Sequence, residues 1–501
     1  MSQHLAEVAG TAPGAAAPRA LRLAERLRAR IGADRVLTDP AQLRTYECDG
    51  LATFRVRPAV VVLAGHRDDV VETVRMCARD GVPFVARGSG TGLSGGAMPV
   101  ADGVLIVLSR LRSIVSVDPD NARVVAEPGV VNLWVTREAA LYGQAYAPDP
   151  SSQQVCSIGG NVAENAGGAH CLKYGFTVNH VMGAEVVLSD GEVVHLGGTA
   201  PEHPGLDLLG AFVGSEGTLG VATQVTLRTI QAPESVRTML VGFHEVADAA
   251  GTVSDVIAAG ILPAAIEMMD ALAIEAAEAA VQCGYPHGAV AVLVIELDGP
   301  RAEVDEQFRL VEEIAGARNA FETRIARDDA ERALMWRGRK SAFAAVGRIS
   351  PAYYVQDGVI PRTRLPEVLA EIGRLADEAG VRVANVFHAG DGNLHPLILF
   401  DDKVPGAAPA AEELGFAILD LCVDLGGSIT GEHGVGVEKK SKMARQFTDA
   451  DLDTMQLVRC AFDPAGIANP GKLFPTPRLC GERPGVRTAD DRRDPSLGEV
   501  F

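Results

Sequence analysis

The sequence predicts an α+β protein with two domains, and three observations support this prediction. The chain has 501 residues, whereas one domain usually takes about 100 to 200. Short runs of β-branched residues alternate with stretches of helical periodicity in both halves of the chain. The 54 glycines exceed the usual share of about 7% and gather into three clusters in the first half. Such clusters indicate that the backbone approaches a ligand closely.

The chain is expected to begin with a tail and a helix. Residues 1–20 are rich in Ala, Gly and Pro, which predicts a mobile N-terminal tail. Residues 21–56 form a helical lead-in, because apolar residues recur every four positions from Leu23 to Ile31. We expect this helix to end near Gly32.

Residues 57–233 form the first predicted domain. Runs of apolar and β-branched residues predict its strands, and the apolar side chains of residues 68–79 share one face of a predicted helix. The predicted strands are 60–63, 82–86, 104–108, 185–188 and 223–227.

Residues 234–476 form the second predicted domain, which is also α+β. After it, residues 477–501 are rich in Gly, Pro, Asp and Arg and poor in apolar residues, which predicts a flexible tail. The predicted elements of the second domain are strands at 289–296, 381–387 and 397–400 and a helix at 365–378.

Composition excludes several classes of function. The 46 Lys and Arg residues against 65 Asp and Glu residues give a net charge of −19, so we expect no nucleic-acid partner. The eight cysteines include no CxxC pair, which argues against an iron–sulfur cluster and favours free thiols in a reducing compartment. No apolar run approaches the ~18 residues of a transmembrane helix, and no signal peptide is recognisable. We therefore expect a cytoplasmic protein.

The first glycine cluster, residues 85–96, contains a literal GxGxxG pattern. A Rossmann dinucleotide site needs a helix directly after the last glycine, whereas Pro99 and Gly103 here precede a predicted strand. No Lys-Ser or Lys-Thr pair follows, which argues against a Walker A loop. The cluster is then either a nest of backbone N–H groups for a pyrophosphate or a hairpin of purely structural use.

The second and third clusters make the ligand interpretation stronger. In residues 157–170 two Gly-Gly pairs are separated by Asn161 and Asn165, so the segment has little side-chain bulk but many amide donors and acceptors. A flat heteroaromatic ring would fit such a surface. Residues 148–152 and 214–220 have the same character.

Together these segments resemble the FAD-binding domain of the vanillyl-alcohol-oxidase type, also called the p-cresol methylhydroxylase (PCMH) type. The similar segments are 87–91, 94–96, 158–161, 165–168, 174–175 and 214–220. The resemblance implies a FAD-binding domain of two subdomains, followed by an α+β substrate or cap domain. It also implies noncovalent FAD, because the first cluster lacks the histidine that tethers the flavin in some relatives. The cofactor-binding residues that it implies are Arg87, Gly88, Ser89, Gly90, Thr91, Ser94, Gly95, Gly96, Pro148, Asp149, Ser157, Gly159, Gly160, Asn161, Asn165, Gly167, Gly168, Tyr174, Gly175, Glu216, Gly217, Gly220, Val221 and Asn469.

Residues 385–400 place two histidines on either side of a turn. One predicted strand runs into His388 and another resumes after His395, so a hairpin brings the two imidazoles together. Two such nitrogens suit a divalent metal, although they could equally hydrogen-bond the turn. Glu432 and His433 follow in a glycine-rich loop, where the carboxylate would complete a two-histidine, one-carboxylate set or would merely be solvated.

From about residue 20 to residue 476 the chain resembles the FAD-linked oxidases, and among them the flavin subunits of bacterial glycolate oxidases most. The similar segments in the second half are 336–343, 353–361, 387–401 and 469–472. The resemblance implies oxidation of a short D-2-hydroxy acid, glycolate or D-lactate, to the 2-oxo acid, by the catalytic subunit of a glycolate oxidase-like complex. The alternatives are a stand-alone D-lactate or D-2-hydroxyglutarate dehydrogenase and a noncatalytic flavin-binding subunit. A metal hydrolase would leave the glycine clusters unexplained.

Hydride transfer from a hydroxy acid requires a deprotonated hydroxyl, and this chemistry assigns roles to the site. His388, His395 and Glu432 would bind a divalent metal, namely zinc, manganese or iron, which lowers the pKa of the hydroxyl. His433 would then take the proton.

One arginine is expected to bind the substrate carboxylate. By motif position this is Arg337, with Ser341 nearby. We expect Arg339, Lys340 and Arg348 to be surface charges.

The resemblance also implies partners and a limit on substrate size. An iron–sulfur subunit and a second FAD-type subunit would carry the electrons to the membrane, with which the chain would associate only through this complex. In D-2-hydroxyglutarate dehydrogenases a second cation precedes the acidic residue that corresponds to Asp357 by two positions, whereas this chain has Val355 there. We therefore expect short acids as substrates.

Overall fold

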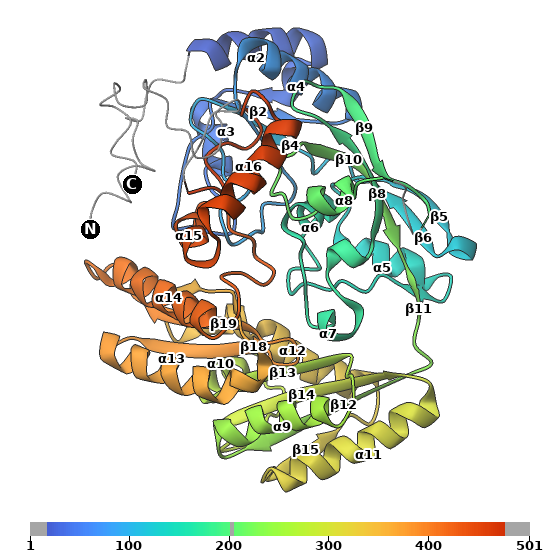
Figure 1. The fold of residues 1–501 in the computed structure, drawn as a ribbon, viewed down its shortest axis with the longest axis vertical. Helices are drawn as coiled ribbons and strands as arrows, with labels where there is room; N and C mark the ends of the chain where they lie inside the picture. The colour runs from blue at the N-terminus through green and yellow to red at the C-terminus, as the bar shows by residue number, and fades with distance from the viewer. Residues whose placement is uncertain (1–17, 201–204, 476–501) are drawn as a thin grey trace.

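In the computed structural model, which describes residues 18–200 and 205–475, the chain forms two α+β bodies stacked along its long axis (Figure 1). The predicted tails lie largely outside the described residues. Only the end of the N-terminal one is described, and there Pro18 already begins a helix instead of continuing a tail.

The first subdomain of the upper body is built on a four-stranded sheet. The strand order is β1-β2-β4-β3, in which β4 lies parallel to both β2 and β3. The loop between β3 and β4 contains the first glycine cluster and no helix, which agrees with the rejection of a Rossmann site. Helices α2 and α4 pack on this sheet. The elements are α2 (Pro18–Ile31), β1 (Val36–Leu37), β2 (Val60–Leu63), α4 (Arg67–Asp80), β3 (Phe84–Arg87) and β4 (Val104–Val107).

The second subdomain is a five-stranded antiparallel sheet with short helices beside it. Its strand order is β5-β6-β10-β8-β9. The second glycine cluster begins a helix, α6, although glycine pairs disfavour helices. Gly159 is needed there because a Cβ would lie 2.6 Å from the Cβ of Pro128. The elements are β5 (Ile114–Asp118), β6 (Arg123–Ala126), α5 (Asn132–Ala140), α6 (Ile158–Glu164), β8 (Val181–Val187), β9 (Val193–Gly197), α8 (Leu208–Phe212) and β10 (Val221–Arg228).

The lower body is one large antiparallel sheet between two layers of helices. Its order is β15-β12-β14-β13-β18-β19-β16, and β17 also pairs with β19. Helices α9, α11, α13 and α14 enclose one core with this sheet, whereas α10 and α12 enclose another. The strands are β12 (Ser235–Phe243), β13 (Ala265–Asp270), β14 (Ala291–Gly299), β15 (Glu322–Ile325), β16 (Ala352–Val355), β17 (Gly358–Val359), β18 (Arg382–His388) and β19 (Asn393–Phe400). The helices are α9 (Val246–Ala258), α10 (Ala271–Val281), α11 (Arg301–Ala317), α12 (Asp329–Ala345), α13 (Leu365–Ala379) and α14 (Ala407–Asp424).

The end of the chain returns to the upper body. Helices α15 (Met443–Gln446) and α16 (Asp449–Phe462), red in Figure 1, lie beside the N-terminal elements. Ile467 and Ala468 join the core under the first sheet, and Ala468 pairs with Phe84 of β3. The predicted second domain, 234–476, is therefore not one body in space, because backbone pairing draws its last segment back to β3.

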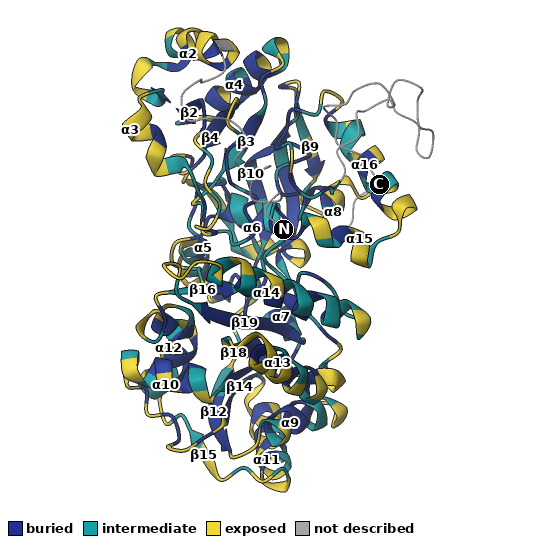
Figure 2. Ribbon diagram, turned by 90° about the vertical axis from the view of Figure 1, so that its left-hand side faces the viewer, coloured by how far each residue is buried: buried dark blue, intermediate teal, exposed yellow. Residues whose placement is uncertain are grey.

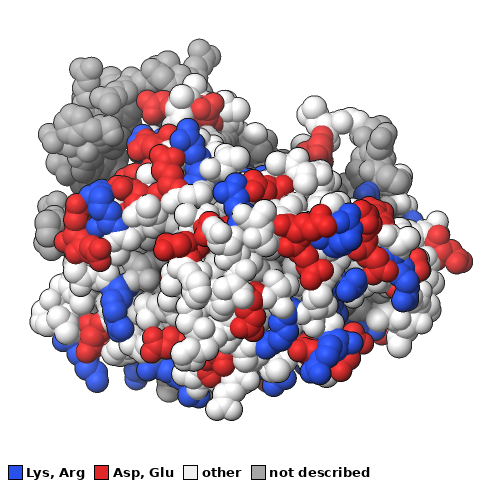
Figure 3. All heavy atoms as spheres, turned by 90° about the horizontal axis from the view of Figure 1, so that it is seen from below, with Lys and Arg blue, Asp and Glu red and all other residues white. Residues whose placement is uncertain are grey.

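Burial follows the two-body plan (Figure 2). The central strands of both bodies are buried, the edge strands β5, β9 and β15 are partly exposed, and the helices expose their outer faces. The face seen from below in Figure 3 mixes acidic and basic side chains.

Within the described ranges, no helix has the length and apolar character that would be needed to cross a membrane.

The cysteines of the described part are largely free thiols. These are Cys48, Cys77, Cys156, Cys171, Cys283 and Cys422. Cys460 is disulfide-bonded, so the expectation of a free thiol is wrong for that residue.

Candidate functional site

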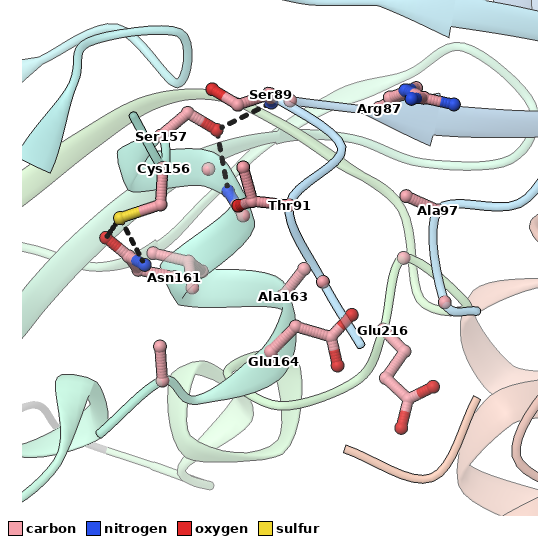
Figure 4. A pocket seen from close by; sticks show the side chains of 18 of the residues that line it. Arg87, Ser89, Thr91, Ala97, Cys156, Ser157, Asn161, Ala163, Glu164 and Glu216 are labelled. Carbon is pink, nitrogen blue, oxygen red and sulfur yellow. Dashed lines mark hydrogen bonds between the residues drawn. The ribbon is translucent and has the colours of Figure 1, made fainter. Parts of the chain in front are cut away.

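One cavity lies where the three glycine clusters meet (Figure 4). Its walls come from residues 86–97, 150–166 and 212–222 of the upper body and from Glu432 and His433. The empty space between these walls, including the part open to solvent, is ≈ 1220 Å³. The cavity therefore joins the glycine clusters to the predicted catalytic loop, which lies more than two hundred residues later in the sequence.

Many of the residues expected to bind the cofactor line this cavity. Ser157 holds two of the segments together, because its Oγ accepts hydrogen bonds from the backbone N–H of Ser89 at 3.3 Å and of Gly160 at 3.4 Å. A Cβ on Gly88 would collide with the same hydroxyl. The lining residues among those expected are Arg87, Gly88, Ser89, Gly90, Thr91, Gly96, Ser157, Gly159, Gly160, Asn161, Glu216, Gly217, Gly220 and Val221.

The other residues expected to bind the cofactor do not line the cavity. Asn469 donates hydrogen bonds to the carbonyls of Gly96 at 2.9 Å and Glu216 at 2.5 Å, and so ties the first cluster to the third. Asn165 ends α6 in the left-handed conformation. The residues that do not line the cavity are Ser94, Gly95, Pro148, Asp149, Asn165, Gly167, Gly168, Tyr174, Gly175 and Asn469.

The hairpin of β18 and β19 brings the predicted metal ligands together. The Nε2 atom of His388 lies 3.3 Å from Glu432 Oε1, and the Nε2 atom of His395 lies 3.1 Å from the same oxygen. The ligand atoms of the three residues lie within 4.8 Å of one another. His388 ends β18, as expected. The next strand, β19, begins at Asn393 and not after His395, so His395 lies inside the strand, opposite Val386.

A buried carboxylate orients His388 from behind. Glu267 on β13 accepts a hydrogen bond from His388 Nδ1 at 2.8 Å, which points Nε2 toward Glu432. The Arg339 guanidinium lies 2.6 Å from Glu267, and both side chains are buried. Glu267 was not predicted from the sequence, although it is a single acidic residue within the apolar run 265–269, and that pattern could have indicated it.

A second carboxylate, Asp357, holds the loop that carries Glu432 and His433. It accepts hydrogen bonds from the Thr430 hydroxyl at 2.6 Å and from the backbone N–H of His433 at 2.8 Å. Lys439 lies 3.3 Å away, and both charged groups are fully buried. Burial alone would raise the pKa of Asp357, but the positive charge of Lys439 helps to hold it below its usual value.

The donor set fits a divalent cation. Two imidazole nitrogens and a carboxylate oxygen converge at hydrogen-bonding distances, where a cation would replace shared protons. Glu432 Oε2 is buried and has no hydrogen-bond partner. Burial opposes the charge of Glu432, but hydrogen bonds from His388 and His395 hold its pKa well below the usual value.

His433 lies beside the proposed metal ligands and also lines the cavity. Its ring stacks on His395 with centroids 5.0 Å apart and planes 11° apart. Its Nδ1 atom is buried without a hydrogen-bond partner. Burial lowers the pKa of His433 to about 4, so the imidazole is neutral and can accept a proton.

The structure corrects the predicted arginine. Arg337 is exposed on α12, whereas Arg339 is 3% exposed and faces Glu267. Residues two apart on a helix point to nearly opposite sides, so only one of the two can face the core. Lys340 and Arg348 are exposed, as expected, although Lys340 also lies 3.3 Å from Asp149. Ser341 is half-buried on the same helix.

His170 links the two bodies. Its Nδ1 lies 2.9 Å from Asp149, and its Nε2 lies 3.2 Å from Glu296 on β14. Glu296 also accepts a hydrogen bond from the Trp336 indole at 2.7 Å. Next to His170, Tyr174 on α7 (Cys171–Tyr174) donates a hydrogen bond to Asp298 at 2.6 Å. His170 thus docks the upper body on β14 and α12, and it is not among the residues that line the cavity.

Comparisons with known proteins identify the family to which the chain belongs. Residues 58–197 match the family described as "FAD binding domain", and residues 232–473 match "FAD linked oxidases, C-terminal domain". The glycolate oxidase subunit GlcD of Escherichia coli (strain K12) is 51% identical over 447 residues, which cover 89% of this chain and 90% of that protein. GlcD of Bacillus subtilis (strain 168) is 36% identical over 86% of this chain and 92% of its own length. D-lactate dehydrogenase of Anaerostipes hadrus is 31% identical over 88% of this chain and 95% of its own length.

Solved structures share the fold at lower identity. 4-Ethylphenol oxidase from Gulosibacter chungangensis matches with a TM-score of 0.77 and 19% identity, over 93% of this chain and 99% of that one. p-Cresol methylhydroxylase with substrate bound matches with a TM-score of 0.75 and 17% identity, over 92% and 98% of the two chains. These matches confirm the predicted fold, a PCMH-type FAD-binding domain with a second α+β domain.

Proposed function

Because this chain belongs to the family of FAD-linked oxidases, we propose that it oxidises a short D-2-hydroxy acid, glycolate or D-lactate, to the 2-oxo acid with noncovalent FAD. One observation carries the proposal: a single cavity joins the glycine clusters to Glu432 and His433. A flavin held by the clusters would therefore meet a substrate held at the predicted metal ligands.

The cavity walls suit FAD. At Gly88, Gly90 and Gly96 a Cβ would collide with neighbouring side chains, so only glycine allows the close approach of the first cluster to the rest of the cavity wall. Such a glycine-rich loop can present backbone N–H groups to a pyrophosphate. Among the described residues that line the cavity, His433 is the only histidine. Because His433 is itself the proposed base, it is not available to tether the flavin, which supports noncovalent binding. Bound FAD supplies the acceptor for the hydride that leaves the substrate carbon.

The proposed metal ligands and the proposed base activate the substrate hydroxyl. His388, His395 and Glu432 would hold a divalent metal, zinc, manganese or iron, which lowers the pKa of a coordinated hydroxyl. His433 takes the hydroxyl proton, since it lines the cavity and its Nδ1 has no other partner. Glu267 and Asp357 position these side chains from behind.

Arg339 takes the place of Arg337 as the cation for the substrate carboxylate. It is buried beside the Glu267–His388 pair, and its Nε has no hydrogen-bond partner. An exposed guanidinium would be screened by water, whereas a buried one binds a carboxylate strongly. Ser341 stays a proposed neighbour of the substrate.

Reduced flavin must pass its electrons to a partner. The chain has no CxxC pair for an iron–sulfur cluster of its own, and its relatives in Escherichia coli and Bacillus subtilis are named as subunits of glycolate oxidase. We propose an iron–sulfur subunit and a second FAD-type subunit as the acceptors, in a cytoplasmic complex that meets the membrane through those partners.

The visible spectrum of the purified protein tests the proposal. The flavin band should be present and should bleach on anaerobic addition of glycolate or D-lactate. His433→Ala should keep both the band and the bound metal but lose the bleaching. A colourless protein, or a yellow one that neither acid reduces, would contradict the proposed reaction.

A further inference from the structure

One acidic side chain in the cavity has no partner that accounts for it. Glu164, the last residue of α6, lines the cavity, and its Oε2 atom is buried without a hydrogen-bond partner. Its role was not predicted from the sequence. A buried ionised carboxylate without donors is strongly unfavourable, so the group needs either a counter-ion or a proton.

A second carboxyl group, that of Glu216, lies next to it (Figure 4). A Cβ built on Gly96 would lie 2.5 Å from Glu164 Oε1 and 3.6 Å from Glu216 Oε2. A Cβ on Gly434 would touch Glu164 Oε2 and would lie 2.9 Å from Glu216 Oε1. The two carboxyl groups therefore occupy the same small space between the first glycine cluster and the loop that follows His433.

The hydrogen bonds decide which carboxyl group is ionised. Both oxygens of Glu216 accept a backbone N–H, from Val435 at 2.6 Å and from Gly436 at 2.7 Å. These donors stabilise the ionised form of Glu216, whereas Glu164 Oε2 has none. Two adjacent buried carboxyl groups cannot easily both be charged, so the proton belongs on Glu164.

The other charges around Glu164 do not change this result. Lys439 is paired with Asp357 at 3.3 Å, and Lys472 donates to the carbonyl of Met98 at 2.8 Å and to Asn469 at 2.6 Å. Asp49 adds a further negative charge on the same side. Burial, Glu216 and Asp49 together raise the pKa of Glu164 well above its usual value.

We propose that Glu164 is a neutral carboxylic acid that donates a hydrogen bond to the bound flavin ring. The inference rests on the proposed function only in that the cavity binds FAD. The ring must lie near Glu164, because the Glu164 carboxyl group adjoins Gly434, the residue after the proposed base. The carbonyl oxygens and ring nitrogens of a flavin accept hydrogen bonds, and the ring gains negative charge when it receives a hydride. A donor at this point therefore stabilises the reduced cofactor.

The proportion of reduced flavin at a fixed potential tests the proposal. The full chain with its bound FAD is titrated anaerobically with a chemical reductant and a reference dye, so that no substrate is needed. Glu164→Gln keeps a neutral N–H donor, and its ratio of reduced to oxidised flavin should stay within about twofold of the unmodified protein. Glu164→Leu has no donor, and its ratio should fall by about fivefold to tenfold. Glu192→Gln, which alters a carboxylate 71% exposed to solvent, is the matched control and should change nothing.

Two outcomes would overturn the proposal. A rise of more than about tenfold in Glu164→Gln would show that a negative charge had been removed, and an unchanged ratio in Glu164→Leu would show that Glu164 donates nothing to the ring.

Infrared difference spectra of the unmodified protein decide the matter if the variants lose FAD. Reduction should shift the C=O band of a protonated carboxyl group, and the absence of such a band also overturns the proposal. A protein that binds FAD and passes these tests but fails to oxidise glycolate or D-lactate would contradict the proposed function alone.

Discussion

Two residues of the lower body, Glu267 and Val355, carry predictions about the proposed site. Glu267 orients a proposed metal ligand from behind. Val355 lies on β16 opposite Leu397, which is two positions from His395 on β19. The carbonyl oxygen of the next residue, Gln356, lies 3.4 Å from His395 Nδ1, so the backbone at Val355 runs beside the proposed metal site.

Glu267→Gln should weaken metal binding while leaving the flavin in place. The substitution keeps the size of the side chain but removes the charge that orients His388 and pairs with Arg339. Loss of such a supporting group commonly costs about 10- to 100-fold in metal affinity. A titration with Zn²⁺ followed by calorimetry would measure the change, with Glu192→Gln as the control. Unchanged affinity would show that His388 is oriented by something else.

Val355 predicts selectivity for short acids. An apolar side chain cannot pair the second carboxylate of D-2-hydroxyglutarate, and a buried unpaired carboxylate costs several kcal/mol, or at least a few hundredfold in kcat/KM. Glycolate and D-lactate should therefore be oxidised far more efficiently than D-2-hydroxyglutarate. Val355→Lys should narrow the difference, whereas Val355→Met, which adds length without charge, should not. Similar kcat/KM for all three acids in the unmodified protein would contradict the glycolate assignment.

At the scale of elements, the rotation of α12 decides which of its cations reaches the site. Arg339 lies on the buried face of the helix and Arg337 on the exposed face. Arg337→Ala should leave kcat/KM within about twofold, because exposed charges contribute little. Arg339→Ala should lower it by at least a hundredfold, because a buried ion pair and a carboxylate-binding group are lost together. Steady-state kinetics of the two variants, with metal content measured in parallel, would compare them. Equal effects would refute the assignment of Arg339.

The junction of α7 with β14 should make stability depend on pH. Asp149 and Glu296 raise the pKa of His170 to about 10 despite its burial. This stabilisation is fully present below the unfolded pKa of about 6.5 and is lost as the pH rises through about 10. The free energy of unfolding should therefore fall across this range, and His170→Gln should remove that part of the slope. Denaturant unfolding at several pH values would measure both curves, and parallel curves would contradict the role of His170.

At the scale of the whole molecule, the cavity is assembled from both bodies, and this determines how the cofactor is held. Asp357 accepts a hydrogen bond from the backbone N–H of His433 and so holds the loop that carries Glu432 and His433. The last segment of the chain returns to β3 and places Asn469 between two glycine clusters. The flavin would thus be enclosed by packing and hydrogen bonds.

Noncovalent FAD should be released when this enclosure unfolds. Acid precipitation should leave the flavin in the supernatant, because no histidine stands in the first glycine cluster. The absorption of the supernatant and of the washed pellet measures the distribution. Flavin that stays with the pellet would show a covalent bond.

Much of the fold could be predicted because its signals are local. The helix predicted at 68–79 is α4 (Arg67–Asp80), and the one predicted at 365–378 is α13 (Leu365–Ala379). Both have a continuous apolar face, which the sequence displays directly. The helix α6 could not be predicted, since its Gly159-Gly160 pair opposes helix formation. Gly159 is required by contact with Pro128, some thirty residues earlier.

The sequence by itself determined the residue types that the proposed chemistry needs: three glycine clusters for a flavin, and two histidines and a Glu-His pair for the proposed metal and base. Residue type and short spacing are sufficient for that, because glycine permits close approach and imidazole and carboxylate bind metal wherever they converge. Only the tertiary structure decided that Arg339 and not Arg337 faces the site, that Glu267 and Asp357 support it, and that Glu164 shares its space with Glu216. The role of each of these residues is set by partners on other elements, and such partners meet only when the two bodies have folded and packed together.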